Sequence, residues 1–130
     1  MSDHRYEEGM QIRREVLGDD HIERAETNKT SFDADFQRFI TETAWGNIWS
    51  RQGLDRKTRH LVTIAMLAAL GKEHELALHI RASPNTGITS DEVKEVMMQV
   101  AIYAGVPAAN TAIAIAKNVF LELKEEEVAE

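Results

Sequence analysis

The segment from Leu61 to Leu70 carries no charge and a single polar side chain, that of Thr63. At the pitch of an α-helix this segment is apolar almost all the way round, so it predicts a buried central helix. Gly71 interrupts the pattern, and Lys72–Ser83 resumes it with polar residues spread among the apolar ones. The sequence therefore predicts a central helical hairpin between residues 55 and 85, around which the remaining chain packs.

The flanking segments also show the spacing of amphipathic helices. Glycines, a proline and capping residues delimit five of them: residues 5–17, 19–28, 30–52, 89–104 and 108–123. Thr89 and Glu92 have the spacing of a capping box, and Asp19 with Asp20 can cap the helix that follows Gly18. Residues 124–130 are predicted to be an acidic, frayed tail. Since no segment alternates like a strand, the sequence predicts an all-α fold of six or seven helices.

The segment 30–52 is predicted to begin with a cap and to carry an aromatic stripe. Thr30 and Asp33 resemble a capping box in which aspartate replaces the usual glutamate. The predicted stripe of the helix that follows consists of Phe32, Phe36, Phe39, Ile40 and Thr43. Such a stripe is expected to pack against the rest of the chain.

Composition limits the class of protein. The 130 residues suit one domain covering 1–130, and 43% of them are apolar, which is enough for a core. A net charge of −7 without any basic run argues against nucleic acid as a partner. The absence of cysteine excludes disulfides, thiol redox chemistry and cysteine-rich zinc sites, and it fits a cytoplasmic protein. The polar N-terminus predicts no signal peptide, and the longest apolar run is far shorter than the roughly 20 residues of a membrane span.

The last two predicted helices are apolar on more than one face. Ile113 and Ile115 point about 200° apart on a helix, so one of them is expected to be exposed in a monomer. Self-association is the simplest way to cover that surface, and the sequence therefore predicts a homo-oligomer.

Glu75 and His79 are the first candidates for chemistry. They are four residues apart, which places them on one face of the second hairpin helix, at the edge of its core stripe. A carboxylate beside an imidazole favours the imidazolium and so creates a proton donor. The alternative is an ordinary ion pair on a solvated face, and spacing alone favours that alternative.

Five further residues are candidates with structural alternatives. His60 opens the central helix and either lines a site or fills the core with a hydrogen bond. Trp45 and Trp49 form a pair on one face, either a pocket wall or part of a core or subunit interface. Arg51 and Arg81 could each hold a substrate carboxylate, or be surface arginines. No metal is expected, because His74-Glu75 begins a zincin motif that fails at Leu78.

Collinear pieces along nearly the whole chain resemble the γ-carboxymuconolactone decarboxylase family. These pieces are Tyr6-Glu7, Gly9-Met10, Arg13–Gly18, Ala44-Trp45-Gly46, Ile48-Trp49, Gly53-Leu54-Asp55, Thr58-Arg59, Leu67–Gly71, Glu75–Ala82 and Ala101–Asn110. The resemblance implies an alkylhydroperoxidase-D-like helical fold, assembled as a hexamer from three dimers. It also implies decarboxylation of 4-carboxymuconolactone, a small carboxylated lactone, in the β-ketoadipate pathway of aromatic catabolism, without a cofactor.

The resemblance suggests roles for the candidate residues. His79 is expected to be the acid or the donor to the developing oxyanion, and Glu75 to orient or charge it. Arg51 is the preferred ligand of the substrate's acetate arm, with Trp45 and Trp49 as pocket walls. His60 and Arg81 remain further candidates for substrate binding.

The chain departs from its relatives at three places. It lacks the cysteine pair of the peroxidases in the superfamily, which disfavours thiol-dependent peroxidase activity. His60 stands where a small or charged residue is expected, and Ser83–Gly87 differs from the usual loop. Two alternatives therefore stay open: a paralogue acting on another small carboxylic acid or lactone, and a non-catalytic helical oligomer that binds a ligand or a partner protein.

Overall fold

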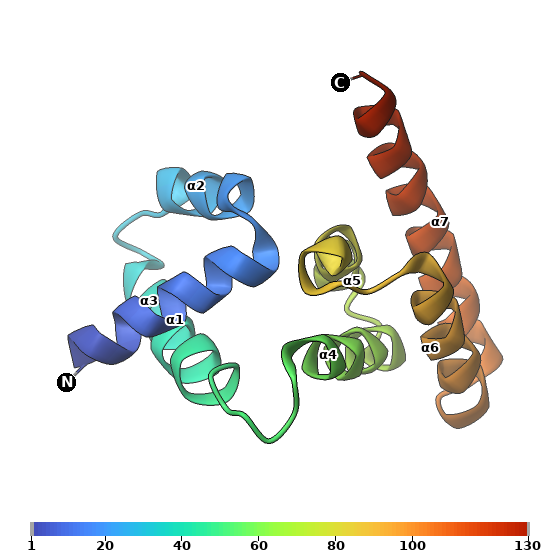
Figure 1. Ribbon diagram of the computed structural model, residues 1–130, viewed down its shortest axis with the longest axis horizontal. Helices are drawn as coiled ribbons and strands as arrows, with labels where there is room; N and C mark the ends of the chain where they lie inside the picture. The colour runs from blue at the N-terminus through green and yellow to red at the C-terminus, as the bar shows by residue number, and fades with distance from the viewer. Residues whose placement is uncertain (1, 130) are drawn as a thin grey trace. The chain divides into compact units, whose positions relative to one another are not determined.

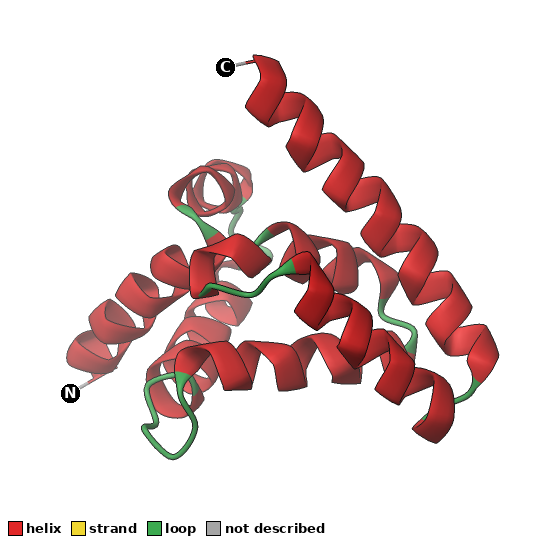
Figure 2. Ribbon diagram, turned by 45° about the vertical axis from the view of Figure 1, so that its right-hand side comes forward, coloured by secondary structure: helices red, strands yellow, loops and turns green. Residues whose placement is uncertain are grey.

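A computed structural model describes residues 2–129, and all regular structure within them is helical (Figure 2). Seven α-helices, one π-helical segment (η1) and one 3₁₀ segment (η2) follow one another in this part of the chain: α1 Ser2–Leu17, α2 Asp19–Asn28, α3 Ala34–Ile40, η1 Thr41–Ile48, α4 Arg56–Leu70, α5 Glu73–Arg81, η2 Ser83–Thr86, α6 Ser90–Tyr103 and α7 Val106–Ala129. The all-α prediction is confirmed. The chain forms two compact units, residues 1–56 and 57–130, and each is described by itself.

In the first unit α1 packs against α2 and against η1. Two glycines allow a very close approach between α1 and η1. A Cβ atom built on Gly9 would lie 2.8 Å from the backbone nitrogen of Gly46 and still closer to the carbonyl oxygen of Thr41. A Cβ atom on Gly46 would lie 2.7 Å from the carbonyl oxygen of Arg5. Both glycines are therefore needed because backbone meets backbone here.

A buried arginine determines which face of α3 and η1 turns inward. Arg13 is 7% exposed, and its guanidinium donates to Thr41 Oγ1 and to Gln37 Oε1, each at 3.2 Å. These polar acceptors face α1, so the phenylalanines of the same segment face away. Phe32, Phe36 and Phe39 are 96%, 59% and 60% exposed in this chain. The prediction that this stripe packs inward is wrong for the single chain.

Two predicted caps of the first unit differ in detail. Gly18, with φ at 94°, is the N-cap of α2, and Asp19 is already the first helical residue. The Thr30 backbone N–H donates to Asp33 Oδ1 at 2.8 Å, as a capping box requires. The Thr30 hydroxyl, however, accepts from the backbone N–H of Phe32, and the helix begins only at residue 34. The predicted box is therefore half formed.

In the second unit the predicted hairpin is present as α4 and α5 and packs with α6 and α7 around one core. The largest fully buried apolar side chains of this core include Ile64, Leu76, Ile80 and Met97. The prediction that α4 is buried all round is wrong for the single chain. Its buried positions follow a spacing of four, at His60, Ile64 and Ala68, and the opposite side exposes Val62, Met66 and Leu70.

The capping box of α6 is confirmed. The backbone N–H of Glu92 donates to Thr89 Oγ1 at 3.1 Å, and the backbone N–H of Thr89 donates to Glu92 Oε1 at 2.9 Å. Gly105, with φ at 110°, separates α6 from α7, as predicted.

The C-terminal helix α7 continues to Ala129, so the prediction of a frayed tail is wrong for residues 124–129, and residue 130 lies outside the described residues (Figure 1). Arg81 of α5 explains the difference. Its guanidinium pairs with Glu126 at 2.9 Å and Glu122 at 3.1 Å, and these carboxylates lie one helical turn apart on α7. Among residues 2–129, no helix is both long and apolar enough to cross a membrane.

Candidate active site

The second unit brings together two of the predicted site residues, His60 and His79. His60 comes from the buried face of α4 and is fully buried, and His79 comes from the last turn of α5 and is 7% exposed. His60 Nε2 lies 3.1 Å from His79 Nδ1. The rings meet edge to face, with centroids 5.2 Å apart and planes inclined by 74°. The sequence had singled out both histidines without predicting this hydrogen bond.

The hydrogen bond between the histidines continues into the 3₁₀ segment. His60 Nδ1 lies 2.7 Å from Thr86 Oγ1, and the Thr86 hydroxyl donates to the Ser83 carbonyl oxygen at 3.2 Å. The Ser83 hydroxyl in turn donates to the carbonyl oxygen of Ile80 at 2.6 Å. A chain of hydrogen bonds therefore runs from α5 through α4 to η2 and back to the end of α5.

Burial lowers the pKa of His60 from its usual 6.5 to about 4. The ring is thus neutral at pH 7, with one N–H donor and one bare acceptor nitrogen. A neutral imidazole can accept a hydrogen bond from a neighbouring histidine in either of that neighbour's charge states. His60 therefore suits a buried position beside His79.

The other predicted residues of this unit lie in different surroundings. Glu75 is exposed on α5, whereas His79 is buried, so the two side chains of the predicted pair differ in solvation. Its role beside His79 stays a prediction. Arg81 pairs with Glu126 and Glu122. The hydrogen bond to Glu126 contributes most to raising the pKa of Arg81 above its usual value, and the bond to Glu122 raises it as well. Both carboxylates lie on α7, so these pairs join α5 to α7, and the predicted binding of a substrate carboxylate by Arg81 stays a prediction.

Trp45, Trp49 and Arg51 belong to the first unit. The indole rings of Trp45 and Trp49 stack with centroids 4.7 Å apart and planes inclined by 24°, which confirms the predicted aromatic pair. The π-helical segment places them, since its backbone bonds reach one residue further than in an α-helix: the Trp49 N–H donates to the Ala44 carbonyl oxygen at 2.9 Å. Arg51 follows in an exposed loop. Its predicted binding of a substrate carboxylate stays a prediction.

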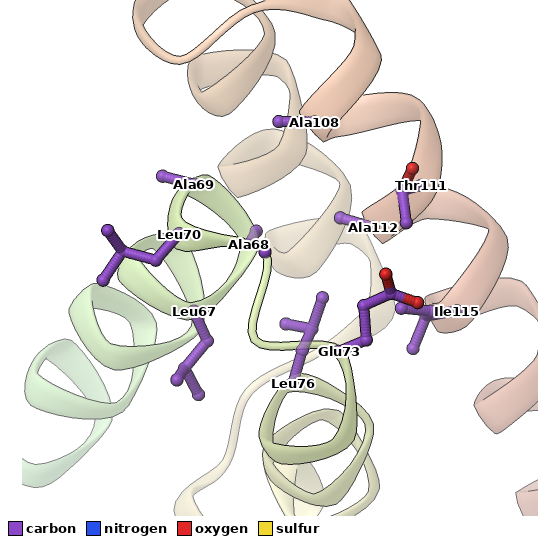
Figure 3. A pocket seen from close by; sticks show the side chains of 11 residues that line it. Leu67, Ala68, Ala69, Leu70, Glu73, Leu76, Ala108, Thr111, Ala112 and Ile115 are labelled. Atoms are coloured by element: carbon purple, nitrogen blue, oxygen red, sulfur yellow. The ribbon is translucent and has the colours of Figure 1, made fainter.

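A cavity of about 210 Å³ lies between the ends of α4, α5 and α7 (Figure 3). Its walls are mostly apolar, with Leu67, Leu76 and Ile115 from the three helices, and Glu73 is its one charged residue. Neither His60 nor His79 lines it. Within the described residues no three histidine, aspartate or glutamate side chains are placed to hold a metal ion.

Ser83 and Thr86 are the site residues that the sequence did not suggest. The segment Pro84–Gly87 has the composition of a turn, and a threonine in a turn has no pattern that marks it as a histidine partner. One signal was available. The sequence analysis expects position 60 and the loop 83–87 to depart from the resembled family, and in the structure His60 and Thr86 contact each other.

Comparison with known proteins shows which sequences the chain resembles over most of its length. Residues 34–118 match the profile of the carboxymuconolactone decarboxylase family. The chain is 51% identical to 4-carboxymuconolactone decarboxylase of Acinetobacter baylyi, over 92% of this chain and 89% of that protein. It is 38% identical to nitrosuccinic acid decarboxylase of Metarhizium robertsii, over 87% of this chain and 79% of that protein. It is also 46% identical to a 4-carboxymuconolactone decarboxylase sequence of Pseudomonas putida, over 33% of this chain and 90% of that sequence.

Proposed function

Because the chain belongs to the carboxymuconolactone decarboxylase family, we propose that it converts 4-carboxymuconolactone to the enol-lactone of 3-oxoadipate with release of CO₂. The observation that carries the proposal is the 51% identity to the Acinetobacter baylyi protein over 92% of this chain. The all-helical structure is consistent with the fold of that family. We also propose that the whole chain acts as one domain, since the family match runs across the boundary between residues 56 and 57.

The substrate can supply its own electron sink. Its leaving carboxylate is attached to the ring carbon γ to the lactone carbonyl, and a ring double bond joins the α and β carbons. When the bond to the carboxylate breaks, the electron pair moves through this double bond to the carbonyl oxygen and gives a dienolate. Protonation of the α carbon then gives the enol-lactone. The protein needs to stabilise the dienolate oxygen and to deliver one proton.

His79 is the proposed proton donor. Its ring is held at Nδ1 by the neutral His60, so Nε2 is the nitrogen that would act on the substrate. In the imidazolium form, the Nε2–H bond breaks as a C–H bond forms at the α carbon, and a neutral ring with its proton on Nδ1 remains. The acid is restored when Nε2 of the neutral ring takes up a proton from solvent before the next turnover. Glu75, near the start of the same helix, is the proposed source of a favourable negative field for the imidazolium.

A second candidate substrate class is another small carboxylic acid. The observation that favours it is the 38% identity to nitrosuccinic acid decarboxylase over 87% of the chain. The unusual His60 and the unusual loop 83–87 add to it, because they change the surroundings of the proposed proton donor. The leading proposal and this alternative share the acid–base role of His79 and differ in the group that bears the leaving carboxylate.

A direct assay tests the proposal. 4-Carboxymuconolactone is generated in situ, the purified protein is added, and the enol-lactone is followed by NMR beside a control without enzyme. Turnover well above the control is expected from wild type and not from His79→Gln. If a folded wild type leaves the lactone at the control rate, the proposed substrate is wrong, and nitrosuccinic acid is the next compound to assay.

We further propose that the chain assembles into a homo-oligomer, a hexamer built as a trimer of dimers. Large apolar side chains that the single chain exposes support this, among them Met66 and Leu70 on α4 and Ile102 at the end of α6. Light scattering coupled to size exclusion is expected to give six times the chain mass of 14.7 kDa. Met66→Glu with Leu70→Glu is expected to lower that mass, whereas Gln52→Glu in an exposed loop leaves it unchanged. A wild-type mass of a single chain would contradict the proposal.

A further inference from the structure

The hydrogen bond from Thr86 to Ser83 gives a direction to the chain of hydrogen bonds around His60. The Thr86 hydroxyl has one proton, and the Ser83 carbonyl oxygen, 3.2 Å away, can only accept it. The Ser83 carbonyl oxygen accepts from the backbone N–H of Ile88 as well, at 3.1 Å. With the Thr86 proton directed to Ser83, Thr86 Oγ1 accepts from His60 at 2.7 Å. This direction places the proton of His60 on Nδ1.

The tautomer of His60 assigns that of His79. With its proton on Nδ1, neutral His60 presents a bare Nε2 to His79 Nδ1 at 3.1 Å. Two bare nitrogens would repel each other at this distance, so His79 must carry a proton on Nδ1. In neutral His79 the other nitrogen, Nε2, is then a base, and in the imidazolium it is an acid. If neutral His79 carried its proton on Nε2 instead, its Nδ1 could not donate a hydrogen bond to His60 Nε2.

We propose that His60 and Thr86 form a tautomer lock, in which they are positioning residues that keep the proton of His79 on Nδ1 and direct Nε2 to the reaction. The proposal rests on the proposed role of His79. The lock makes use of two segments that are far apart in the sequence, the start of α4 and the end of η2. Burial protects it, since His60 is fully buried and a competing water is kept from its ring.

The tautomer can be measured without any substrate. Long-range ¹H–¹⁵N correlation spectra of protein labelled at its five histidines report which ring nitrogen carries the proton, and His60→Gln and His79→Gln assign the signals. Neutral His79 in the wild type is expected to be protonated on Nδ1, and exposed His74 serves as the control that averages between both forms. Thr86→Val is expected to move the His79 signals away from the Nδ1–H pattern. A wild-type His79 protonated on Nε2 would overturn the proposal.

Kinetics give a second readout on the substrate that wild type turns over. His60→Leu removes the acceptor and is expected to lower kcat by about 10- to 100-fold, as the loss of a partner that orients a metal-ligating histidine does, with little change in KM. His60→Gln can place an amide oxygen near His79 Nδ1 and is expected to restore most of kcat. Thr86→Val is expected to lower kcat when it is made in the wild type. When it is combined with His60→Gln it is expected to lower kcat no further, because the amide at position 60 does not depend on a hydrogen bond to Thr86.

The outcomes separate the lock from the proposed function. A folded His60→Leu with wild-type kcat would overturn the lock and leave the decarboxylation intact. A wild type that turns over neither candidate acid would overturn the proposed function, and the NMR spectra would still decide the tautomer. If His60→Leu fails to fold, Thr86→Val and His60→Gln carry the test. Equal effects of Thr86→Val in the wild-type and the His60→Gln backgrounds would count against the lock.

Discussion

His60 Nε2 lies 3.1 Å from His79 Nδ1, although the two residues are on different helices and one of them is fully buried. Because the fully buried His60 ring bonds both Thr86 and His79, we expect it to act on a substrate through His79. The direct substrate contact for which the sequence made His60 a candidate stays a prediction.

The pKa of His60 makes stability depend on pH. Its pKa is about 4 in the folded chain and close to 6.5 when unfolded, so between these values only the unfolded state takes up a proton. The His60 contribution to the free energy of unfolding is complete above pH 6.5 and declines by about 3 kcal/mol as the pH falls to 4. Urea unfolding of wild type and His60→Gln between pH 7 and pH 4 measures it. A difference between the two proteins that stays constant over this range would contradict the prediction.

Removal of the proposed proton donor should affect turnover much more than removal of its exposed neighbour. His79→Gln is expected to lower kcat by about 10²- to 10⁴-fold, the usual contribution of a general acid. Glu75→Gln removes an exposed charge whose field is screened by water, so a decrease of less than about 10-fold is expected. Steady-state rates on the accepted substrate compare the two. Wild-type rates in both variants would mean that neither residue takes part.

The close approach of α1 and η1 should not tolerate a methyl group. In Gly9→Ala the new Cβ would meet backbone atoms of Thr41 and Gly46, which can yield only if the two segments move apart. We expect a loss of about 1–3 kcal/mol in the free energy of unfolding, as for overpacked cores. Gly53→Ala is the matched control, because nothing lies within 4 Å of its Cβ position and its stability should change by less than about 0.5 kcal/mol. Equal stabilities in a urea titration would show that the approach is looser than described.

Arg81 should hold the C-terminal turns of α7. In Arg81→Gln the pairs with Glu122 and Glu126 are lost, so amide hydrogen exchange over residues 122–129 is expected to accelerate. Global stability should change by less than about 1 kcal/mol, because the arginine is partly exposed. Lys94→Gln, whose pair with Asp91 is far more exposed, is the control and should leave this segment unchanged. Unchanged protection in Arg81→Gln would mean that α7 ends at Ala129 without help from α5.

Local patterns in the sequence predicted the helices and several of their ends well. The capping box at Thr89 and Glu92 and the glycines after Leu17, Leu70 and Ala104 depend on neighbours in the chain, so residue type alone suffices to find them. Burial was predicted less well. The phenylalanine stripe of segment 30–52 failed because a single tertiary partner, Arg13, draws the polar face inward.

The candidate site was predictable only in its residue types. Glu75 and His79 were found by their spacing on one helix, which is a local property. The bond between His60 and His79 and the bond between His60 and Thr86 join residues 19 and 26 positions apart. No periodicity of a single chain reports such a contact, because it depends on how the helices are packed. The extension of α7 was missed for the same reason, since Arg81 acts on it across 41 and 45 positions.

The bond between His60 and Thr86 has a consequence for how this chain can evolve. A mutation at position 86 alone removes an acceptor 2.7 Å from a fully buried ring nitrogen of His60. A mutation at position 60 alone leaves the half-buried Thr86 with its hydrogen bond to the Ser83 carbonyl oxygen. The two positions are therefore expected to diverge in a preferred order, with position 60 changing before position 86.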